Sequence, residues 1–430
     1  MSVSRKLTVK SLTRVEGEGA LRVKVVDGRI EIAEFNIYEP PRFFERLLRG
    51  RAIHEVPDIV ARICGICPVA YQLTACHALE KALGIDVTAE IRSLRRLLYC
   101  GEWIQSHALH VHLLHAPDFL GYESGFTMAA DHPRLLERGL RLKEIGGRII
   151  EVIGGRVVHP VNVTVGGFYK APSAAAIRGL VGDLEWGLAA AIDLVGEVSR
   201  FEFQGFRRDC ELVSLVHPLE YPMNEGRVAS SKGLDIPVEA FATHFEERQV
   251  PHSTALHSVR LPGETSYLTG PVARIELSRE RLPERAHRTL DAAWGGRSFD
   301  DPSTSIVARA VEIVAAFEEA IAIARSAAAD VAQPRVEFAP RAGEGCHATE
   351  APRGLLYHRY RIGGDGLVAE ATIIPPTSQN QAQIERDLVK MLPDVLALDD
   401  AAATLACERL IRSYDPCISC ATHFLRFSRS

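Results

Sequence analysis

Several features that define whole classes of protein are missing from this sequence. No uninterrupted apolar run in its 430 residues approaches the about 18 residues of a membrane-spanning helix, so we expect no membrane span. Basic residues are not in excess: 50 Lys and Arg against 55 Asp and Glu give a formal net charge of −5, which argues against binding of nucleic acid. The first residues contain no apolar signal region, and we interpret the chain as a cytoplasmic protein in a reducing compartment.

Cysteine is scarce as well, and its placement is informative. Nine cysteines in 430 residues exclude a scaffold built on disulfides. Four of them form two Cys-x-x-Cys pairs at opposite ends of the chain, Cys64 with Cys67 and Cys417 with Cys420. Two thiolates at this spacing can converge on one metal ion, or they can form a dithiol/disulfide couple. Our hypothesis is that the fold brings both pairs together around metal.

The spacing alone leaves the metal open. Four sulfur ligands are typical of tetrahedral zinc or of an iron–sulfur cluster, and zinc ranks first on this criterion. The flanking residues argue against zinc, because Pro68 and an apolar helical segment follow Cys67 directly. A zinc knuckle usually lies in a small polar loop.

The hydrophobic pattern predicts one compact, predominantly helical α+β unit. The longest helix is expected to end at Pro117, because proline disrupts a helix interior. This helix carries histidines at 107, 110, 112 and 115, which cover more than one face and are expected to be structural or to lie at a subunit contact. A polar segment at 331–352 is expected to be rich in turns. The predicted helices span residues 42–50, 69–83, 88–115, 134–153, 173–200, 303–330, 380–390 and 398–412, and the predicted β-hairpins span 7–38 and 355–374.

The two cysteine motifs together resemble the signatures of a known family. Arg62-Ile-Cys-Gly-Ile-Cys67 and Asp415-Pro-Cys-Ile-Ser-Cys-Ala-Thr-His423 are similar to the two motifs of the large, catalytic subunit of [NiFe] hydrogenases. The segment Cys-Gly-Ile-Cys-Pro-Val-Ala-Tyr71 and the chain length resemble the cytoplasmic, bidirectional, NAD(P)-linked group that includes sulfhydrogenases. Further motifs occur in the order of that family, at residues 14–17, 155–160, 269–271, 350–354 and 376–380.

The resemblance implies a fold and a metal centre. The expected fold is the [NiFe] hydrogenase large-subunit fold with peripheral β-hairpins, formed by residues 1–423 as a single domain. Cys64 and Cys417 would be terminal nickel thiolates. Cys67 and Cys420 would bridge the nickel to an iron that carries CO and CN ligands. Soft sulfur donors suit such a nickel–iron centre.

The resemblance also assigns a route for protons. Heterolytic cleavage of H2 requires a base, for which the sulfur of Cys417 is the candidate. Glu16 matches the carboxylate of the family that carries the proton outward. Taken without the family, Glu16 could simply cap a bend or pair with Arg14.

A pocket above the metals is implied by three further residues. Arg353 matches an arginine that donates hydrogen bonds to a cyanide, with Pro352 and Thr377 completing the pocket. Asp415 matches the carboxylate that pairs with this arginine. Taken alone, Arg353 would be a surface charge, and Asp415 would be a turn residue before a proline.

A second metal site is implied near the C-terminus. Glu45, the carbonyl of Ile373 and His423 match the ligands of a separate Mg2+ or Fe2+ ion, and the histidine leaves Fe2+ open. The family is usually made with a C-terminal extension that is removed after nickel insertion, and residues 424–430 are expected to be that extension.

The sequence departs from many family members at two positions. Tyr71 stands where many hydrogenases have histidine, and Ser106 stands where many have aspartate. The cytoplasmic group shares both residues, so we interpret them as marks of that group.

The implied partners follow from what the chain lacks. It has too few remaining grouped cysteines for a relay of clusters, so electrons would leave through an iron–sulfur small subunit. It has no convincing Gly-x-Gly-x-x-Gly motif, so flavin and NAD(P) would bind to further diaphorase subunits. Maturation proteins and an endopeptidase would complete the centre. The alternatives are a non-catalytic zinc or H2-sensing protein, and a subunit like the quinone-site subunit of complex I, which shares the fold without the paired cysteines.

Overall fold

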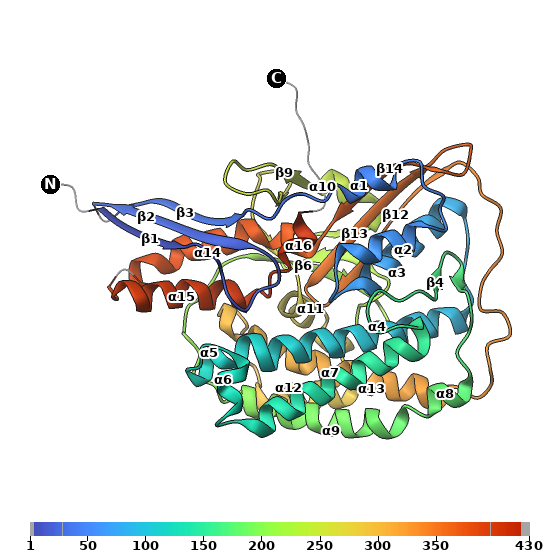
Figure 1. Cartoon of the computed structure of the whole chain (residues 1–430), viewed down its shortest axis with the longest axis horizontal. Coiled ribbons are helices and arrows are strands. Elements are labelled where there is room, and N and C mark those ends of the chain that lie inside the picture. The colour runs from blue at the N-terminus through green and yellow to red at the C-terminus, as the bar shows by residue number, and fades with distance from the viewer. Residues whose placement is uncertain (1–3, 28, 396, 423–430) are drawn as a thin grey trace.

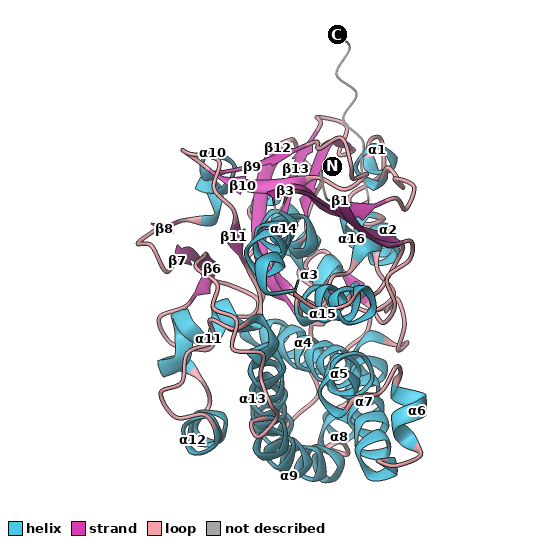
Figure 2. Ribbon diagram, turned by 90° about the vertical axis from the view of Figure 1, so that its left-hand side faces the viewer, coloured by secondary structure: helices cyan, strands magenta, loops and turns pink. Residues whose placement is uncertain are grey.

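The computed structural model describes residues 4–27, 29–395 and 397–422. It confirms a predominantly helical α+β fold in which a layer of helices lies beneath a group of small sheets (Figures 1 and 2). Among the described residues, no helix is both long enough and apolar enough to cross a membrane.

The helical layer contains the largest part of the hydrophobic core. The backbones of α4 and α7 approach closely at two glycines. A Cβ atom at Gly101 would lie only 2.9 Å from the carbonyl oxygen of Gly146. This layer consists of α4 (Ala89–Leu109), α5 (Ala116–Leu120), α6 (Gly125–Ala129), α7 (Pro133–Gly154), α8 (Ala174–Arg178), α9 (Val181–Val198), α11 (Pro271–Ser278), α12 (Glu284–Ala293) and α13 (Ser305–Ser326).

A three-stranded antiparallel sheet packs against helix α3, which begins directly after the first cysteine pair. Glycine makes this contact possible: a Cβ atom at Gly343 or Gly345 would come within 2.2 and 2.3 Å of backbone oxygens of α3. The elements here are α1 (Phe44–Leu48), α2 (Val56–Val60), α3 (Pro68–Leu83), β12 (Gly343–Ala351), β13 (Gly354–Ile362) and β14 (Val368–Ile374).

A second core joins the N-terminal sheet to the C-terminal helices. Leu21, Val23 and Phe35 face these helices and are fully buried. Residues near the two ends of the sequence therefore lie side by side (Figure 1). The elements are β1 (Ser4–Val9), β2 (Gly19–Val26), β3 (Arg29–Ile37), α14 (Pro376–Val395), α15 (Asp400–Ser413) and α16 (Ile418–Ala421).

Short strands and turns connect these parts. The four-stranded sheet has the order β11-β6-β7-β8, with β11 parallel to β6 and the other pairs antiparallel. The strands are β4 (Val163–Thr164), β5 (Gly167–Phe168), β6 (Glu211–Val216), β7 (Arg227–Ser230), β8 (Asp235–Ile236), β9 (Phe245–Arg248), β10 (His257–Arg260) and β11 (Tyr267–Leu268), with α10 at Phe241–His244. Single 3-10 turns span Ala61–Ile63, Val238–Ala240, Arg279–Arg281 and Pro302–Thr304.

Three local predictions were wrong. The long helix does not end at Pro117: a π-helical turn, His110–His115, leads into α5, where Pro117 occupies the first turn and its missing N–H costs nothing. The predicted helix 173–200 is divided into α8 and α9. Part of the segment expected to be rich in turns is strand β12, which pairs with β13 and widens the predicted hairpin into a sheet.

The four histidines of the long helix are structural. All are buried, and each bonds within the chain: His107 to Glu312, His110 to a carbonyl of α15, His112 to its own helix and His115 to Ser413. None of them therefore needs a subunit contact.

Candidate metal centre

The first cysteine pair is held where a turn meets a helix. Cys64 follows the 3-10 turn Ala61–Ile63 in extended conformation, and Cys67 immediately precedes Pro68, the first residue of α3. The backbone N–H groups of Ile66 and Cys67 donate to the sulfur of Cys64 at 3.3 and 3.2 Å. Two donors aimed at one sulfur favour its thiolate form.

The second pair is held from the opposite side. Cys417 precedes α16, and its backbone N–H donates to the hydroxyl oxygen of Thr377 at 3.0 Å, at the start of α14. The next amide along the chain, that of Ile418, donates to the carbonyl of Glu16 at 2.9 Å. Residues from the N-terminal bend thus position the C-terminal cysteines.

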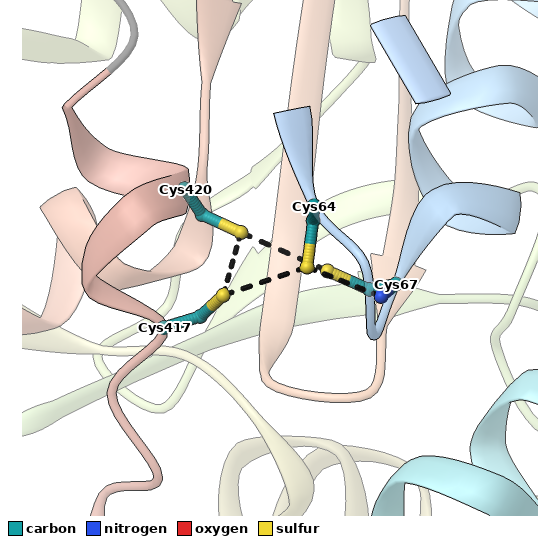
Figure 3. Close-up of side chains that lie close together, drawn as sticks. All are labelled: Cys64, Cys67, Cys417 and Cys420. Atoms are coloured by element: carbon teal, nitrogen blue, oxygen red, sulfur yellow. Dashed lines mark hydrogen bonds between the residues drawn. The ribbon is translucent and has the colours of Figure 1, made fainter. Parts of the chain in front are cut away.

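Folding brings the four sulfurs into one buried cluster (Figure 3). Sulfur–sulfur distances are 3.5 Å between Cys64 and Cys417, 3.8 Å between Cys67 and Cys420, and 2.8 Å between Cys417 and Cys420. All four ligand atoms lie within 4.8 Å of one another, and the four residues are at most 4 % exposed. Metal–sulfur bonds of about 2.3 Å set thiolates about 3.8 Å apart around a tetrahedral ion, and the 3.5 and 3.8 Å distances between the two pairs are close to this spacing.

The four thiols do not hold their protons equally. Burial, together with hydrogen bonds from neighbouring thiols, raises the pKa of Cys417 well above its usual value. Burial also opposes a charge on Cys64, but hydrogen bonds from the thiols of Cys417, Cys420 and Cys67 outweigh it and hold the pKa of Cys64 well below its usual value. A bound cation would displace the remaining protons.

Glu16 places a carboxylate in contact with the second cysteine pair. Its Oε2 atom accepts from the thiol of Cys417 at 3.0 Å and from the backbone N–H of Ser419 at 3.1 Å. Its side chain is half-buried, so it lies between the buried sulfurs and solvent. The interpretation of Glu16 as only a partner of Arg14 does not fit this geometry, because Arg14 pairs with Asp118 at 2.5 Å.

Arg353 is a buried cation close to the cluster. It occupies the turn between β12 and β13 and donates to the backbone oxygen and a carboxylate oxygen of Asp415 at 2.9 and 3.0 Å. Its Nη1 atom is 3.4 Å from the hydroxyl of Ser106. Burial opposes the charge, but the carboxylate of Asp415 and the sulfur of Cys417 raise the pKa of Arg353 well above its usual value. The arginine therefore remains a fixed cation beside the thiolates.

The structure also places three further predicted residues, Pro352, Glu45 and Ile373. Pro352 shares the turn with Arg353, and its carbonyl accepts from Arg274 at 3.0 Å. Glu45 and Ile373 do meet: the Ile373 N–H donates to a carboxylate oxygen of Glu45 at 2.7 Å. His423 and the predicted extension 424–430 lie outside the described residues.

Sequence reasoning missed two residues that position the cysteine pairs. Arg42 donates to the carbonyl of Ile63, at 2.7 Å, and to that of Ser419, so one guanidinium joins the two cysteine loops. Glu102 of α4 accepts from the first two free N–H groups of α3, those of Val69 and Ala70, at 2.6 and 3.0 Å. A carboxylate on the apolar face of a predicted helix was the available signal for Glu102. Nothing local distinguished Arg42.

The comparisons place this geometry in a family. The family model described as nickel-dependent hydrogenase matches residues 42–134 and 295–423, so each matched segment contains one cysteine pair. Sulfhydrogenase 1 subunit alpha and sulfhydrogenase 2 subunit alpha of Pyrococcus furiosus are each 32% identical to this chain over 98% of its length, covering 98% and 99% of their own lengths.

Solved structures agree with the sequence relatives. A structure of an NAD+-reducing [NiFe]-hydrogenase in the H2-reduced state superposes with a TM-score of 0.89 and 26% identity, covering 97% of this chain and 99% of that one. A [NiFeSe]-hydrogenase of Desulfomicrobium baculatum has the same fold at 22% identity, with a TM-score of 0.77 over 98% of this chain and all of its own. This chain belongs to the nickel-dependent hydrogenase family and has the large-subunit fold of a [NiFe] hydrogenase.

Proposed function

We propose that this chain is the catalytic subunit of an enzyme that interconverts H2 with two protons and two electrons. The observation that carries the proposal is the buried group of four cysteine sulfurs with a carboxylate in contact with one of them. Retention of all four cysteines argues against a subunit like the quinone-site subunit of complex I.

The four cysteines would hold the metals in unequal roles. Cys64 and Cys417 would bind nickel alone, and Cys67 and Cys420 would bridge it to an iron with CO and CN ligands. When bound, this nickel–iron group supplies the redox chemistry that splits H2. Its iron would be assembled and inserted by maturation proteins.

The chain's own contribution to the reaction is a place for the proton. The sulfur of Cys417 would take one proton from H2, and Glu16 would accept it across the 3.0 Å contact. The N–H of Ser419 holds the carboxylate in this position, and the half-buried side chain allows the proton to leave towards solvent.

The buried cation would orient the iron's ligands. Arg353 would donate to a cyanide, with Pro352 and Thr377 completing the pocket. The bond from the Arg353 guanidinium to Asp415 supports this role, because it fixes the direction of the remaining donors. A separate Mg2+ or Fe2+ ion at Glu45, Ile373 and His423 is part of the same proposal, supported by the contact between the first two residues.

Electrons would leave through other subunits. Outside the four-cysteine group, the described residues contain no second cysteine cluster, so the chain would pass electrons to an iron–sulfur small subunit. The similarity to sulfhydrogenase alpha subunits and to an NAD+-reducing hydrogenase supports further flavin and NAD(P) subunits.

Metal analysis and infrared spectroscopy test the proposal directly. We expect one nickel per chain, infrared bands from CO and CN, and H2-dependent dye reduction. The Cys417→Ser variant should lose nickel, whereas Cys407→Ser, which alters a buried cysteine away from the cluster, should keep it. Stoichiometric zinc with no nickel in mature protein would contradict the proposal and favour a zinc protein.

A further inference from the structure

A second group of potential metal ligands lies apart from the cysteine cluster. His252, His257 and Glu385 each offer one ligand atom, and these atoms lie within 4.8 Å of one another. They come from three separate places: the segment before β10, the first residue of β10, and the middle of α14. Figure 2 shows β10, β3 and α14 next to one another in this region.

The carboxylate of Glu385 stands at the middle of the group. Its Oε1 atom is 2.7 Å from Nε2 of His252 and accepts from the backbone N–H of Phe35 at 2.9 Å. Its Oε2 atom is 3.9 Å from Nδ1 of His257, which is too long for a hydrogen bond. The two imidazole rings lie 5.7 Å apart at 82°.

A simple ion pair explains only part of this arrangement. The contact between His252 and Glu385 needs no metal. His257, however, is only 5 % exposed, and its 3.9 Å approach to Glu385 is not a hydrogen bond, so the ion pair does not account for this third group. A nitrogen of a neutral imidazole is a common ligand for a metal ion.

The surroundings supply charge and access. Glu34 of β3 places a carboxylate oxygen 3.9 Å from the other nitrogen of His252, while its second oxygen pairs with Arg22 at 3.0 Å. Two carboxylates beside two imidazoles suit a divalent cation. The side chains of His252 and Glu385 are 19% and 17% exposed, so an ion can reach the group from solvent.

We propose that His252, His257 and Glu385 bind a divalent transition-metal ion, with zinc as the probe that tests it. Two histidines and one carboxylate are an established ligand set for such ions. The ion would tie β10 and the segment before it to α14. This helix begins next to Thr377, whose hydroxyl accepts from the backbone of Cys417, so the ion would brace an element that positions the catalytic cluster.

The first test is a difference in metal content between matched variants of the holoenzyme. Glu385→Gln keeps an oxygen for the Phe35 amide but removes the charged ligand. His287→Ala is the control, because His287 pairs with Asp291 at 3.2 Å and belongs to no three-ligand group among the described residues. We expect wild type and His287→Ala to contain one equivalent of zinc, or of another divalent transition metal. The content of that metal should be at least tenfold lower in Glu385→Gln. Equal content of these metals in all three proteins would overturn the proposal.

A second measurement distinguishes loss of the metal site from a folding defect in the variant. Zinc added to chelator-treated wild type should raise Tm by about 2 °C or more, and should leave the Tm of His257→Gln unchanged. No shift in wild type, or an equal shift in both, would overturn the proposal. Nickel content separates this inference from the proposed function, since loss of the second metal in Glu385→Gln should leave nickel unchanged.

Discussion

Replacing Glu16 with glutamine removes a proton acceptor while preserving its geometry. In the structure one oxygen of Glu16 contacts both the Cys417 thiol, at 3.0 Å, and the Ser419 amide, at 3.1 Å. The amide oxygen of glutamine can still accept from Ser419, so the C-terminal cysteine loop should keep its conformation. What is lost is the ability to take a proton at neutral pH.

The size of the expected effect follows from that single loss. A positioned acid or base contributes typically about 10²- to 10⁴-fold in rate, which corresponds to about 3–5 kcal/mol of transition-state stabilisation. We expect H2 oxidation and H2/D2O exchange to fall by this factor in Glu16→Gln. Nickel content should equal that of wild type, because Glu16 is not a metal ligand in this proposal.

The assay needs a control that changes charge without changing the contact. Glu18→Gln makes the same substitution two residues along the chain, at an exposed side chain, and should leave exchange within about twofold of wild type. Unchanged exchange in Glu16→Gln, with nickel retained, would refute the role of Glu16 as proton acceptor. An equal loss in both variants would assign the effect to overall charge.

Three further predictions concern the support of the site. Arg42→Met removes the guanidinium that bonds to Ile63 and to the second cysteine loop. The variant should have lower nickel occupancy by metal analysis and should be destabilised by about 1–3 kcal/mol in denaturant unfolding. Full nickel occupancy would contradict this prediction. Glu312→Gln removes one of the two carboxylates that pair with the fully buried Arg274, at 2.6 Å, while Glu350 remains at 2.9 Å. The substitution should cost about 1.5–3 kcal/mol in the free energy of unfolding, and no measurable loss would argue against the pair. Burial lowers the pKa of His347 from its usual 6.5 to about 4, so between these pH values the unfolded chain binds a proton that the folded chain does not. The free energy of unfolding should therefore fall by up to about 3 kcal/mol as pH drops from 6.5 to 4. In His347→Gln, the free energy of unfolding measured across this range should fall less steeply.

The helical layer was largely predictable because its helices carry their own signals. The predicted helix 134–153 agrees closely with α7, which Gly155 ends in left-handed conformation. The predicted end of the long helix was wrong, because the rule that proline ends a helix did not apply in this fold. Pro117 did not end the long helix, because a π-helical turn before it allowed a new first turn to start there.

Strand β12 shows why the remaining elements were harder to predict. Its sequence is polar and contains Gly343 and Gly345, which favour turns when considered locally. In the fold, those two glycines let the strand approach the backbone of α3, and the ladder with β13 supplies its hydrogen bonds. A strand whose stability comes from partners distant in sequence has little local signal.

The cysteine pairs show the same division within the metal centre. Their Cys-x-x-Cys spacing was enough to predict paired sulfur ligands, because two residues in one short loop hold two thiolates close together. Spacing could not predict which cysteine of one pair would contact which cysteine of the other, how deeply the sulfurs would be buried, or which charged groups would lie beside them. The contacts of Glu16 with Cys417, of Arg353 with Asp415, and of one arginine with both loops depend on the packing of distant segments. Local chemistry therefore supplied the donor atoms, and long-range packing arranged the acid, the cation and the burial around them.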